Sequence, residues 1–320
     1  MTATIPGPGT AGRPLRVLSL GAGVQSTALL LAAVRDPRRW GRPDVAVFAD
    51  TGWEPAAVYA HLDRLEREVA VPAGIPVLRV SSGHIRDDAL DPGHRFASMP
   101  LYVANPDGGE GMARRQCTSE YKLKAILAAV RTLLGAQPGP DGVPGRVPAG
   151  RWAEQWIGIS ADEAHRALRT RSTRYSRARF PLLEPTIATG LTRGDCGRIN
   201  TAAGFADVAK SACIGCPFHT AAQWRAMRDH RPAEWADAVA FDAAIRHGAA
   251  RATAEGQPLR GRMYLHRSRR PLDQAPIDRI TRTEWAARQT DLLDLLPDPD
   301  RAGHGCSPFD CPNDPEGETC

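Results

Sequence analysis

The sequence lacks any apolar run of about 18 residues, the shortest that predicts a membrane-spanning helix. No membrane span is therefore expected, although 42% of the 320 residues are hydrophobic and a sizeable core can form. The first 14 residues, MTATIPGPGTAGRP, also lack the basic start and apolar stretch of a secretion signal. We expect residues 1–14 to be a disordered lead-in and the protein to be cytoplasmic.

Lysine is nearly absent: the chain has only three, Lys122, Lys124 and Lys210, among 41 basic residues. A lysine kept where arginine is the usual cation indicates a site that needs a compact positive charge, with chance placement as the alternative. All three lie close in sequence to Cys117 or Cys213. The net charge of +5 is compatible with a nucleic-acid or phosphorylated substrate.

Residues 16–20 form a short apolar run that predicts a buried strand, and residues 28–34 predict a helix. Between them lie Gly21, Ala22 and Gly23, with almost no side chain, and then Ser26 and Thr27. A small-residue turn before a helix N-terminus exposes backbone N–H groups to an anion. The turn has neither the dinucleotide-binding glycine spacing nor the Walker A lysine, and an ordinary strand–helix turn is the alternative.

Two further strands, at residues 44–49 and 75–80, alternate with a helix at 55–69. This β-α-β-α-β order predicts an α/β fold with a doubly wound parallel sheet. Asp50 and Thr51 follow the second strand, at the sheet edge where such folds bind ligands. Asp50 is expected either to contact a nucleotide or metal or to cap the next helix.

Residues 88–111 are predicted to be a loop, either covering a substrate or merely connecting elements. A helix is expected at 119–134, with Arg114, Arg115 and Cys117 near its N-terminus, where a thiol pKa falls and anions are favoured. Residues 136–150 are predicted to be a flexible insertion, and a fourth strand to occupy 156–159.

We place a domain boundary near residue 185. A nucleotide-binding α/β domain spans residues 15–185, a mostly helical cysteine-containing domain follows at 186–300, and a tail covers 301–320. In the helical domain, helices are expected at 221–229, from Pro232 to before Gly248, and from Thr281 to Pro297. Gly261 to Leu272 is predicted to be an extended basic segment.

Seven cysteines occur, and without an export signal they favour metal ligands or catalytic thiols over disulfides. Cys213 and Cys216 form a CxxC pair, which is half of a metal site, with Lys210 nearby to offset thiolate charge. Cys117 and Cys196 are candidates for the other half, and four cysteines suit a [4Fe–4S] cluster or zinc. His219 is a further zinc ligand candidate, and the absence of any metal stays open. The tail thiols are either incidental or, for Cys320, a mobile nucleophile; they are Cys306, Cys311 and Cys320.

Five segments resemble, in the same order along the chain, the PP-loop adenine nucleotide alpha-hydrolase superfamily, and within it the phosphoadenosine phosphosulfate (PAPS) reductase-like and DndC-like proteins. They are GAGVQS at 21–26, VFADTGWE at 47–54, RRQCTSEYK at 114–122, IGISADEAHR at 157–166 and KSACIGCPFH at 210–219. Two positions depart from the family pattern. Gln25 stands where an acid is usual, and Gln116 precedes Cys117 where cluster-type reductases have a second cysteine.

The resemblance implies a Rossmann-like PP-loop fold and a set of site residues. The implied nucleotide-binding residues are Ser19, Gly21, Ala22, Gly23, Gln25, Ser26, Thr27, Asp50, Thr51, Gly158, Ser160, Asp162 and Arg171. The implied catalytic residues are Asp50, Arg115 and Lys122, and the implied metal ligands are Cys117, Cys196, Cys213 and Cys216. The implied cofactors are a [4Fe–4S] cluster, favoured over zinc, together with ATP or PAPS and with Mg²⁺. Asp162 and Glu163 are expected either to bind a metal or to orient the substrate.

The function expected from this resemblance is that of a nucleotide-dependent enzyme of sulfur metabolism or sulfur modification. Its partners would be an adenine nucleotide, a sulfur donor protein or reductant, and a nucleic-acid substrate. One alternative is a sulfonucleotide reductase, in which a cysteine thiolate attacks sulfur. The other is a nucleic-acid-binding protein with a structural metal and an inactive nucleotide site, which Gln25 favours.

Overall fold

The computed structural model describes residues 12–94, 99–170, 172–184, 190–248, 261–280, 282, 284 and 285. Among the helices of these residues, none combines the length and the apolar character needed to cross a bilayer. Arg171, residues 286–320 and most of the helix expected at 281–297 lie outside the described residues.

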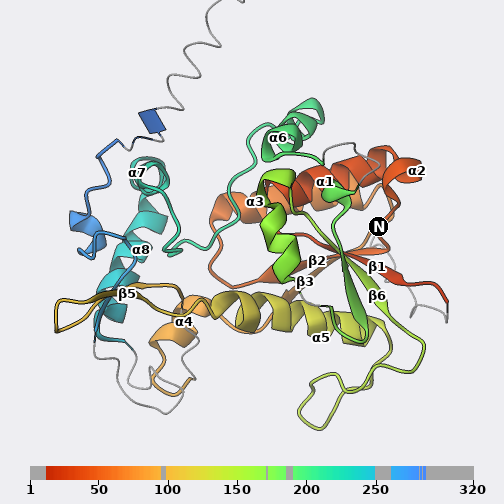
Figure 1. Ribbon diagram of the computed structural model, residues 1–320, viewed down its shortest axis with the longest axis horizontal. Coiled ribbons are helices and arrows are strands. Elements are labelled where there is room, and N and C mark those ends of the chain that lie inside the picture. The colour runs from red at the N-terminus through yellow and green to blue at the C-terminus, as the bar shows by residue number, and fades with distance from the viewer. Residues whose placement is uncertain are drawn as a thin grey trace, which may run out of the picture.

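A five-stranded, all-parallel sheet lies at the centre of the larger lobe (Figure 1). Its strands lie in the order β3-β2-β1-β6-β7, with Val17 of β1 beside Val45 of β2 and Leu18 beside Trp156 of β6. The strands are β1 (Leu15–Ser19), β2 (Val45–Asp50), β3 (Val77–Ser81), β6 (Ala153–Ile157) and β7 (Ser176–Arg179). The predicted doubly wound α/β sheet is therefore confirmed.

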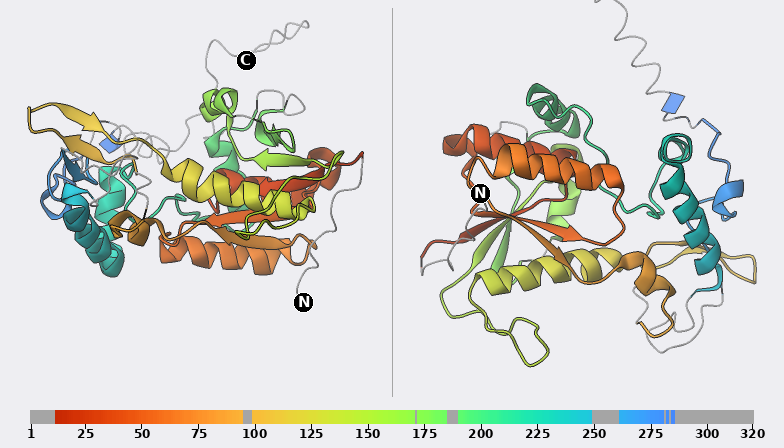
Figure 2. Two further views of the ribbon diagram at one scale, coloured as in Figure 1. Left: turned by 90° about the horizontal axis from the view of Figure 1, so that it is seen from below. Right: turned by 180° about the vertical axis from the view of Figure 1, so that it is seen from behind.

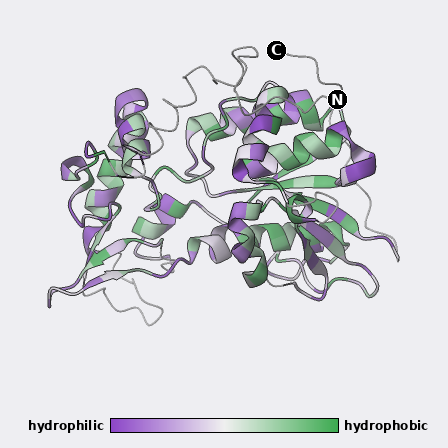
Figure 3. Cartoon of the chain, turned by 45° about the horizontal axis from the view of Figure 1, so that its top comes forward, coloured by the Kyte–Doolittle hydropathy of each residue, from purple (hydrophilic) through white to green (hydrophobic). Residues whose placement is uncertain are grey.

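Helices cover both faces of this sheet (Figure 2). On one face, apolar side chains of β1 and β2 share a core with Leu30, Leu62, Val69 and Cys196. These come from α1 (Val24–Arg35), α3 (Ala56–Leu65), the π-helical η1 (Glu66–Ala70) and α6 (Arg193–Ala202). On the other face, Val17 and Val45 pack with residues of α5 (Lys124–Leu133). The strands of the sheet are mainly hydrophobic, and the covering helices contain both hydrophobic and hydrophilic residues (Figure 3). Hydrophobic strands are expected in a sheet that is buried on both faces.

A smaller lobe packs beside the C-terminal edge of the sheet (Figure 1). It contains a three-stranded antiparallel sheet in the order β5-β4-β8. Its elements are α4 (Ile85–Leu90), β4 (Tyr102–Ala104), β5 (Glu110–Met112), α7 (Ala221–His230), α8 (Pro232–Ala244) and β8 (Arg262–Tyr264). Its core joins Trp53, Ile85 and Tyr121 to Trp224 and Phe241, so segments from distant parts of the sequence build it together.

The remaining short elements connect these layers. They are α2 (Pro37–Trp40), η2 (Thr118–Leu123), η3 (Ala161–Arg169), η4 (Pro181–Leu183), η6 (Ile245–His247) and η7 (Leu272–Gln274).

The structure departs from the sequence expectations in several elements. Helix α1 begins at Val24, four residues before the predicted start, because Gln25, Ser26 and Thr27 are buried against neighbouring segments. The stretch 88–111, predicted to be a loop, contains β4 and β5, which pair with each other and with β8. Strand β7 and helix α6 were not predicted. Their sequences, SRAR and RGDCGRINTA, are mainly polar and lack the hydrophobic periodicity from which a strand or a helix is predicted.

Candidate functional site

The strand order reverses direction at β1 and β6, which are neighbours in the sheet although far apart in sequence. In open α/β sheets this reversal opens a crevice at the carboxyl ends of the strands, where ligands bind. The glycine turn follows β1, and Gly158 follows β6. A Cβ on Gly158 would lie 3.0 Å from the Ser26 nitrogen, so the absence of a side chain lets the two turns meet.

The glycine turn places a helix N-terminus at this crevice. Ala22 adopts a φ of 51°, a left-handed conformation that an alanine adopts at some cost and a glycine adopts freely. Gly23 caps α1, and the first intrahelical bond runs from Thr27 N–H to Gly23 O at 2.9 Å. The N–H groups that come before Thr27, in the first turn of α1, have no intrahelical acceptor. Gly21 is exposed, and a Cβ there would make only ordinary contact with Ser211 Oγ at 3.8 Å.

Three predicted nucleotide-binding side chains have protein partners in this structure. The Ser19 hydroxyl accepts a hydrogen bond from Gln155 Nε2 at 3.0 Å, within the sheet. Thr27 is fully buried, and its hydroxyl lies 2.9 Å from His61 Nε2 on α3. Ser26 Oγ bonds the backbone of Gly23 at both N and O, each at 3.2 Å.

Gln25 joins three segments at the base of α1. Its Nε2 donates to Glu163 Oε2 at 3.1 Å and lies 3.3 Å from Ser160 Oγ, and its Oε1 accepts from Arg193 Nη1 at 3.1 Å. A carboxylate in its place would repel Glu163 and could donate no hydrogen bond to it. The amide at this position therefore fits the local hydrogen bonds of this chain.

Asp162 anchors the N-terminus of α6. Its Oδ1 accepts the Arg193 N–H at 3.0 Å, one of the helix N–H groups without an intrahelical acceptor. Hydrogen bonds from Ser160 and from the Arg193 backbone hold the pKa of Asp162 below its usual value. Ser160 itself is fully buried. These two residues thus tie the turn after β6 to α1 and α6.

Asp50 and Thr51 lie at the carboxyl end of β2, and their side chains serve different neighbours. Asp50 Oδ1 accepts from Gly52 N at 2.8 Å and from the Tyr59 hydroxyl at 2.7 Å. Burial, together with the hydrogen bond to Asp50, raises the Tyr59 pKa. Thr51 instead faces the cysteines, with its Oγ1 3.2 Å from Cys213 Sγ.

The loop that carries the CxxC pair, residues 210–219, lies against the glycine turn. A Cβ on Gly23 would lie 3.2 Å from Ser211 Cβ. The loop is also joined to the turn after β2, because Ile214 N donates to Trp53 O at 2.9 Å. The absence of a side chain at Gly215 admits the Trp53 ring, which any Cβ at that position would overlap.

A carboxylate, an ammonium and a thiol meet beneath this loop. Glu54 is 3% exposed, and its Oε1 accepts from Thr51 Oγ1 at 3.0 Å and lies 3.4 Å from Lys122 Nζ and 3.6 Å from Cys213 Sγ. Its Oε2 is buried without a hydrogen-bond partner among the described residues. Burial raises the Cys213 pKa, and the Glu54 charge raises it further. Burial alone would lower the Lys122 pKa, but attraction to Glu54 prevails and raises it.

Cys117 and Cys216 belong to the same neighbourhood. Burial raises the Cys216 pKa, Cys117 contributes to the increase, and Lys210 and Lys122 oppose it. Cys117 packs against the core cluster that contains Cys213. The Arg115 guanidinium lies 5.4 Å from the centroid of the Phe218 ring in the cysteine loop. Two of the predicted catalytic residues, Arg115 and Lys122, thus lie beside the thiols.

Cys196, the fourth predicted metal ligand, lies elsewhere. It is fully buried on α6 in the core above the sheet, with Leu30 and Leu62. Burial, with the nearby charges of Asp195 and Asp162, raises its pKa to about 12. Across the described residues, no group of three or more His, Cys, Asp or Glu side chains has the arrangement of a metal site. Cys306, Cys311 and Cys320 lie outside the described residues.

Sequence reasoning missed Glu54 as a member of this cluster. Its only sequence signal is its place in VFADTGWE, four residues after Asp50 at a strand end. His219, considered as a zinc ligand, points its Nε2 to the Cys213 carbonyl at 3.0 Å, and burial lowers its pKa to about 4. His266, in the segment predicted to be extended and basic, is buried, and its Nδ1 lies 2.8 Å from Ser268 Oγ.

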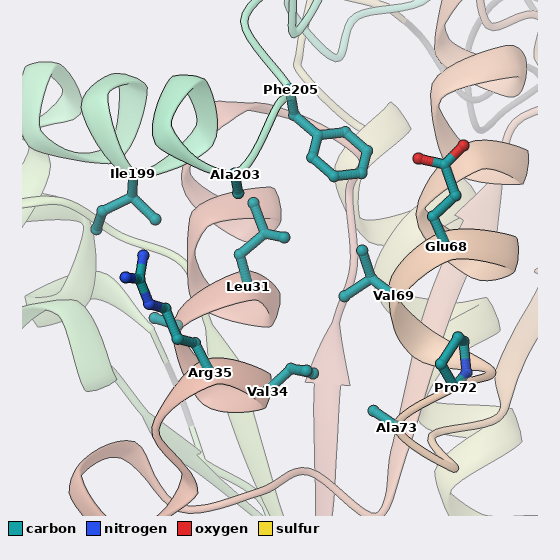
Figure 4. Close-up of a pocket in the computed structure, with 11 residues that line it drawn as sticks. Leu31, Val34, Arg35, Glu68, Val69, Pro72, Ala73, Ile199, Ala203 and Phe205 are labelled. Atoms are coloured by element: carbon teal, nitrogen blue, oxygen red, sulfur yellow. The ribbon is translucent and has the colours of Figure 1, made fainter.

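A separate groove lies at the far end of α1 from the glycine turn (Figure 4). It has a volume of about 450 Å³ between α1, η1 and α6. Its lining is mainly apolar, with Arg35 and Glu68 as the charged residues; the others are Leu31, Ala32, Val34, Val69, Pro72, Ala73, Ile199, Ala203 and Phe205. Its lining includes none of the predicted site residues.

Comparison with known proteins does not assign a function to this site. No protein-family profile matches the chain, and no curated protein sequence matches it either.

Proposed function

We propose that this chain is a nucleotide-dependent enzyme of sulfur metabolism or sulfur modification. The observation that carries the proposal is the contact between the glycine turn and the cysteine loop at the sheet's switch point, where Ser211 approaches Gly21 and Gly23. A helix N-terminus that favours phosphate thereby lies next to a set of thiols. Chemistry that couples a nucleotide phosphate to sulfur needs these two groups side by side.

In this proposal, phosphate binding relies on backbone N–H groups of the turn from Gly21 to Thr27. The side chains of Ser19, Gln25 and Thr27 hold the turn in place through Gln155, Glu163 and His61. Asp50 orients the turn after β2, near the nucleoside. Arg115 offers an exposed cation for anionic oxygens, because its guanidinium rests on the Phe218 ring and has no carboxylate partner in the described part of the chain.

We further propose that Cys117, Cys213 and Cys216 hold an iron–sulfur cluster. The donor set fits such a group: three thiols share one neighbourhood, and Lys122 and Lys210 supply positive charge that offsets thiolates. The three thiols do not form a compact ligand group in this structure. When bound, a cluster would supply a redox-active or sulfur-carrying centre beside the nucleotide.

The chemistry differs between the two candidate nucleotides. With ATP, an acceptor oxygen attacks the α-phosphorus, pyrophosphate leaves, and the adenylate formed is open to attack by sulfur. With PAPS, a thiolate attacks the sulfur and adenosine 3′,5′-bisphosphate leaves. A second thiol, from a thiol reductant, then displaces sulfite and forms a disulfide with the first. Pyrophosphate release therefore identifies the first reaction, and sulfite release identifies the second.

The test of nucleotide binding uses the Gly21→Ala variant. The position tolerates a Cβ sterically, yet a methyl group there obstructs close approach of a phosphate. We expect ATP or PAPS, measured by calorimetry on the full chain, to bind about tenfold or more weakly to this variant. The control is Gly197→Ala on α6, where a Cβ meets no atom within 4 Å. Equal binding by wild type and Gly21→Ala would exclude phosphate binding at this turn.

The test of the cluster uses anaerobic purification and iron analysis. We expect about four irons per chain in the wild type and loss of iron and colour in Cys213→Ser. Cys196→Ser is the matched control, because that thiol is also buried but lies in another core. Iron retained by Cys213→Ser would contradict the assignment of the ligands.

A further inference from the structure

Three arginines without acidic partners surround one pocket at the edge of the sheet opposite the glycine turn. Arg146, Arg151, Arg174 and Tyr175 line it, and its volume is about 660 Å³. The loop 146–151 precedes β6, and Arg174 and Tyr175 directly precede β7. Parallel strands begin at one edge and end at the other, so this pocket is separated from the glycine turn by the length of the strands, roughly 17 Å for five residues.

The charges of this pocket are uncompensated. No carboxylate among the described residues forms an ion pair with Arg146, Arg151 or Arg174, and none of the pocket's lining residues is acidic. Some other arginines of the chain are paired: Arg79 with Asp63 and Glu66, and Arg228 with Asp278. Guanidinium groups gathered around one hollow repel each other unless an anion lies between them.

The positive surface continues beyond the pocket along the sheet edge. Arg177 on β7 is exposed, and its guanidinium stacks 4.4 Å from the centroid of the Trp152 ring. Strand β7 is the outermost strand of the sheet. Arg174 lies in the bend that precedes β7, where Thr173 N donates to Ser176 O at 2.7 Å, and Arg177 lies on the strand itself.

We propose that this edge binds the phosphodiester backbone of a single-stranded nucleic acid. The arginines of the pocket neutralise successive phosphates, and the guanidinium of Arg177, stacked on Trp152, offers a surface on which a base packs. Arg151 also donates to Leu134 O at 3.2 Å, which fixes the loop that closes the pocket. The site lies apart from the proposed nucleotide site and does not depend on it.

The test measures binding of fluorescein-labelled RNA and DNA single strands of about 20 nucleotides to the full chain by anisotropy. We expect binding that weakens steeply between about 50 and 200 mM salt. Arg146→Glu and Arg174→Glu are each expected to weaken it roughly tenfold and to reduce the salt slope by about one unit per arginine. Arg67→Glu, at a side chain that is 70% exposed on η1, is the control of equal charge change.

The comparison of RNA with DNA identifies which nucleic acid the edge prefers. Arg146→Gln and Arg174→Gln repeat the test with a milder change, and unchanged thermal melting shows that the variants fold. Gly21→Ala is expected to keep nucleic-acid binding while losing nucleotide binding, so the two proposals fail independently. Absence of binding by the wild type, equal loss in Arg67→Glu, or binding of free mononucleotide alone would overturn this proposal.

Discussion

At the scale of single residues, Gly215 decides whether the cysteine loop can pack. A side chain there overlaps the Trp53 ring, whose indole N–H donates to Asp237 Oδ2 at 2.6 Å. We expect Gly215→Ala to lower the free energy of unfolding by about 1–3 kcal/mol, measured by urea denaturation. Gly197→Ala, in the interior of α6 and free of contacts, is expected to be neutral or stabilising by up to about 1 kcal/mol. Equal stability of the two variants would contradict this packing.

His219 should make stability depend on pH. Burial lowers its pKa to about 4 in the folded chain, whereas an unfolded histidine titrates near about 6.5. The folded state keeps the ring neutral while the unfolded state takes up a proton, so stability falls as pH drops below about 6.5 and continues to fall toward about 4. Between pH 7 and 5 this amounts to roughly 2 kcal/mol.

The variant His219→Gln tests this pH dependence. Its amide can still donate to the Cys213 carbonyl, but it does not titrate. We expect its stability, measured by urea denaturation, to lose roughly 2 kcal/mol less than the wild type between pH 7 and 5. His165→Gln, at an exposed position, is the control and should follow the wild-type curve. If the stability of His219→Gln depended on pH as strongly as that of the wild type, groups other than His219 would be responsible for the pH dependence.

The residue scale also shows how far the sequence predicts the site. The strand–turn–helix at Gly21 and the strand end at Asp50 follow from local patterns, which fix where such residues stand along a chain. The partners of Gln25, Thr27 and Ser19 come from segments up to 168 residues away. A local sequence pattern contains no information about such distant contacts. The sequence therefore predicts a ligand for these side chains, whereas the structure shows protein partners.

At the scale of elements, α8 fastens the smaller lobe to the start of α3. Glu234 accepts the Ala56 N–H at 2.9 Å, in the first turn of α3. Asp237 accepts from the Trp53 indole and from Arg86 Nε at 2.8 Å. Two acidic residues of α8 thereby accept hydrogen bonds from the segment 53–56 and from α4.

This arrangement predicts a specific cost for Asp237→Ala. The Trp53 N–H and the Arg86 guanidinium lose their acceptor, so the free energy of unfolding should fall by about 1–3 kcal/mol. Calorimetric melting measures the effect. Asp229→Ala, which breaks only a pair with Arg228 at the surface, should change stability by less than about 0.5 kcal/mol. A similar cost for both variants would contradict the fastening role.

Elements with strong periodicity or glycine and proline boundaries were predictable, and weakly patterned ones were not. The helix at 232–244 starts at the predicted Pro232. Strand β7 reads SRAR and is held by pairing with β6 at the sheet edge. Strands β4 and β5 are three residues each, too short for alternation to stand out against a loop.

At the scale of the whole molecule, two of the three hydrophobic cores of the described residues combine residues from before and after position 185. Trp53 packs against Phe241 with ring centroids 4.7 Å apart, and Leu30 shares a core with Cys196. We expect a fragment of residues 12–184 to expose these apolar surfaces, bind a hydrophobic dye and melt without cooperativity. The full chain is the control, and a sharp melting transition of the fragment, measured by calorimetry, would show that it folds alone.

The sequence by itself determined the α/β class, the parallel strands near Val17 and Val45, and the glycine turn between the first strand and helix. These features depend on local periodicity and on residues with special backbone freedom, which act over a few positions. Only the tertiary structure decided that Cys213 lies beside Glu54 and Lys122 while Cys196 lies in another core. Those neighbours depend on how distant elements pack. Burial of apolar surface is favourable for any two complementary faces, whatever their separation along the chain.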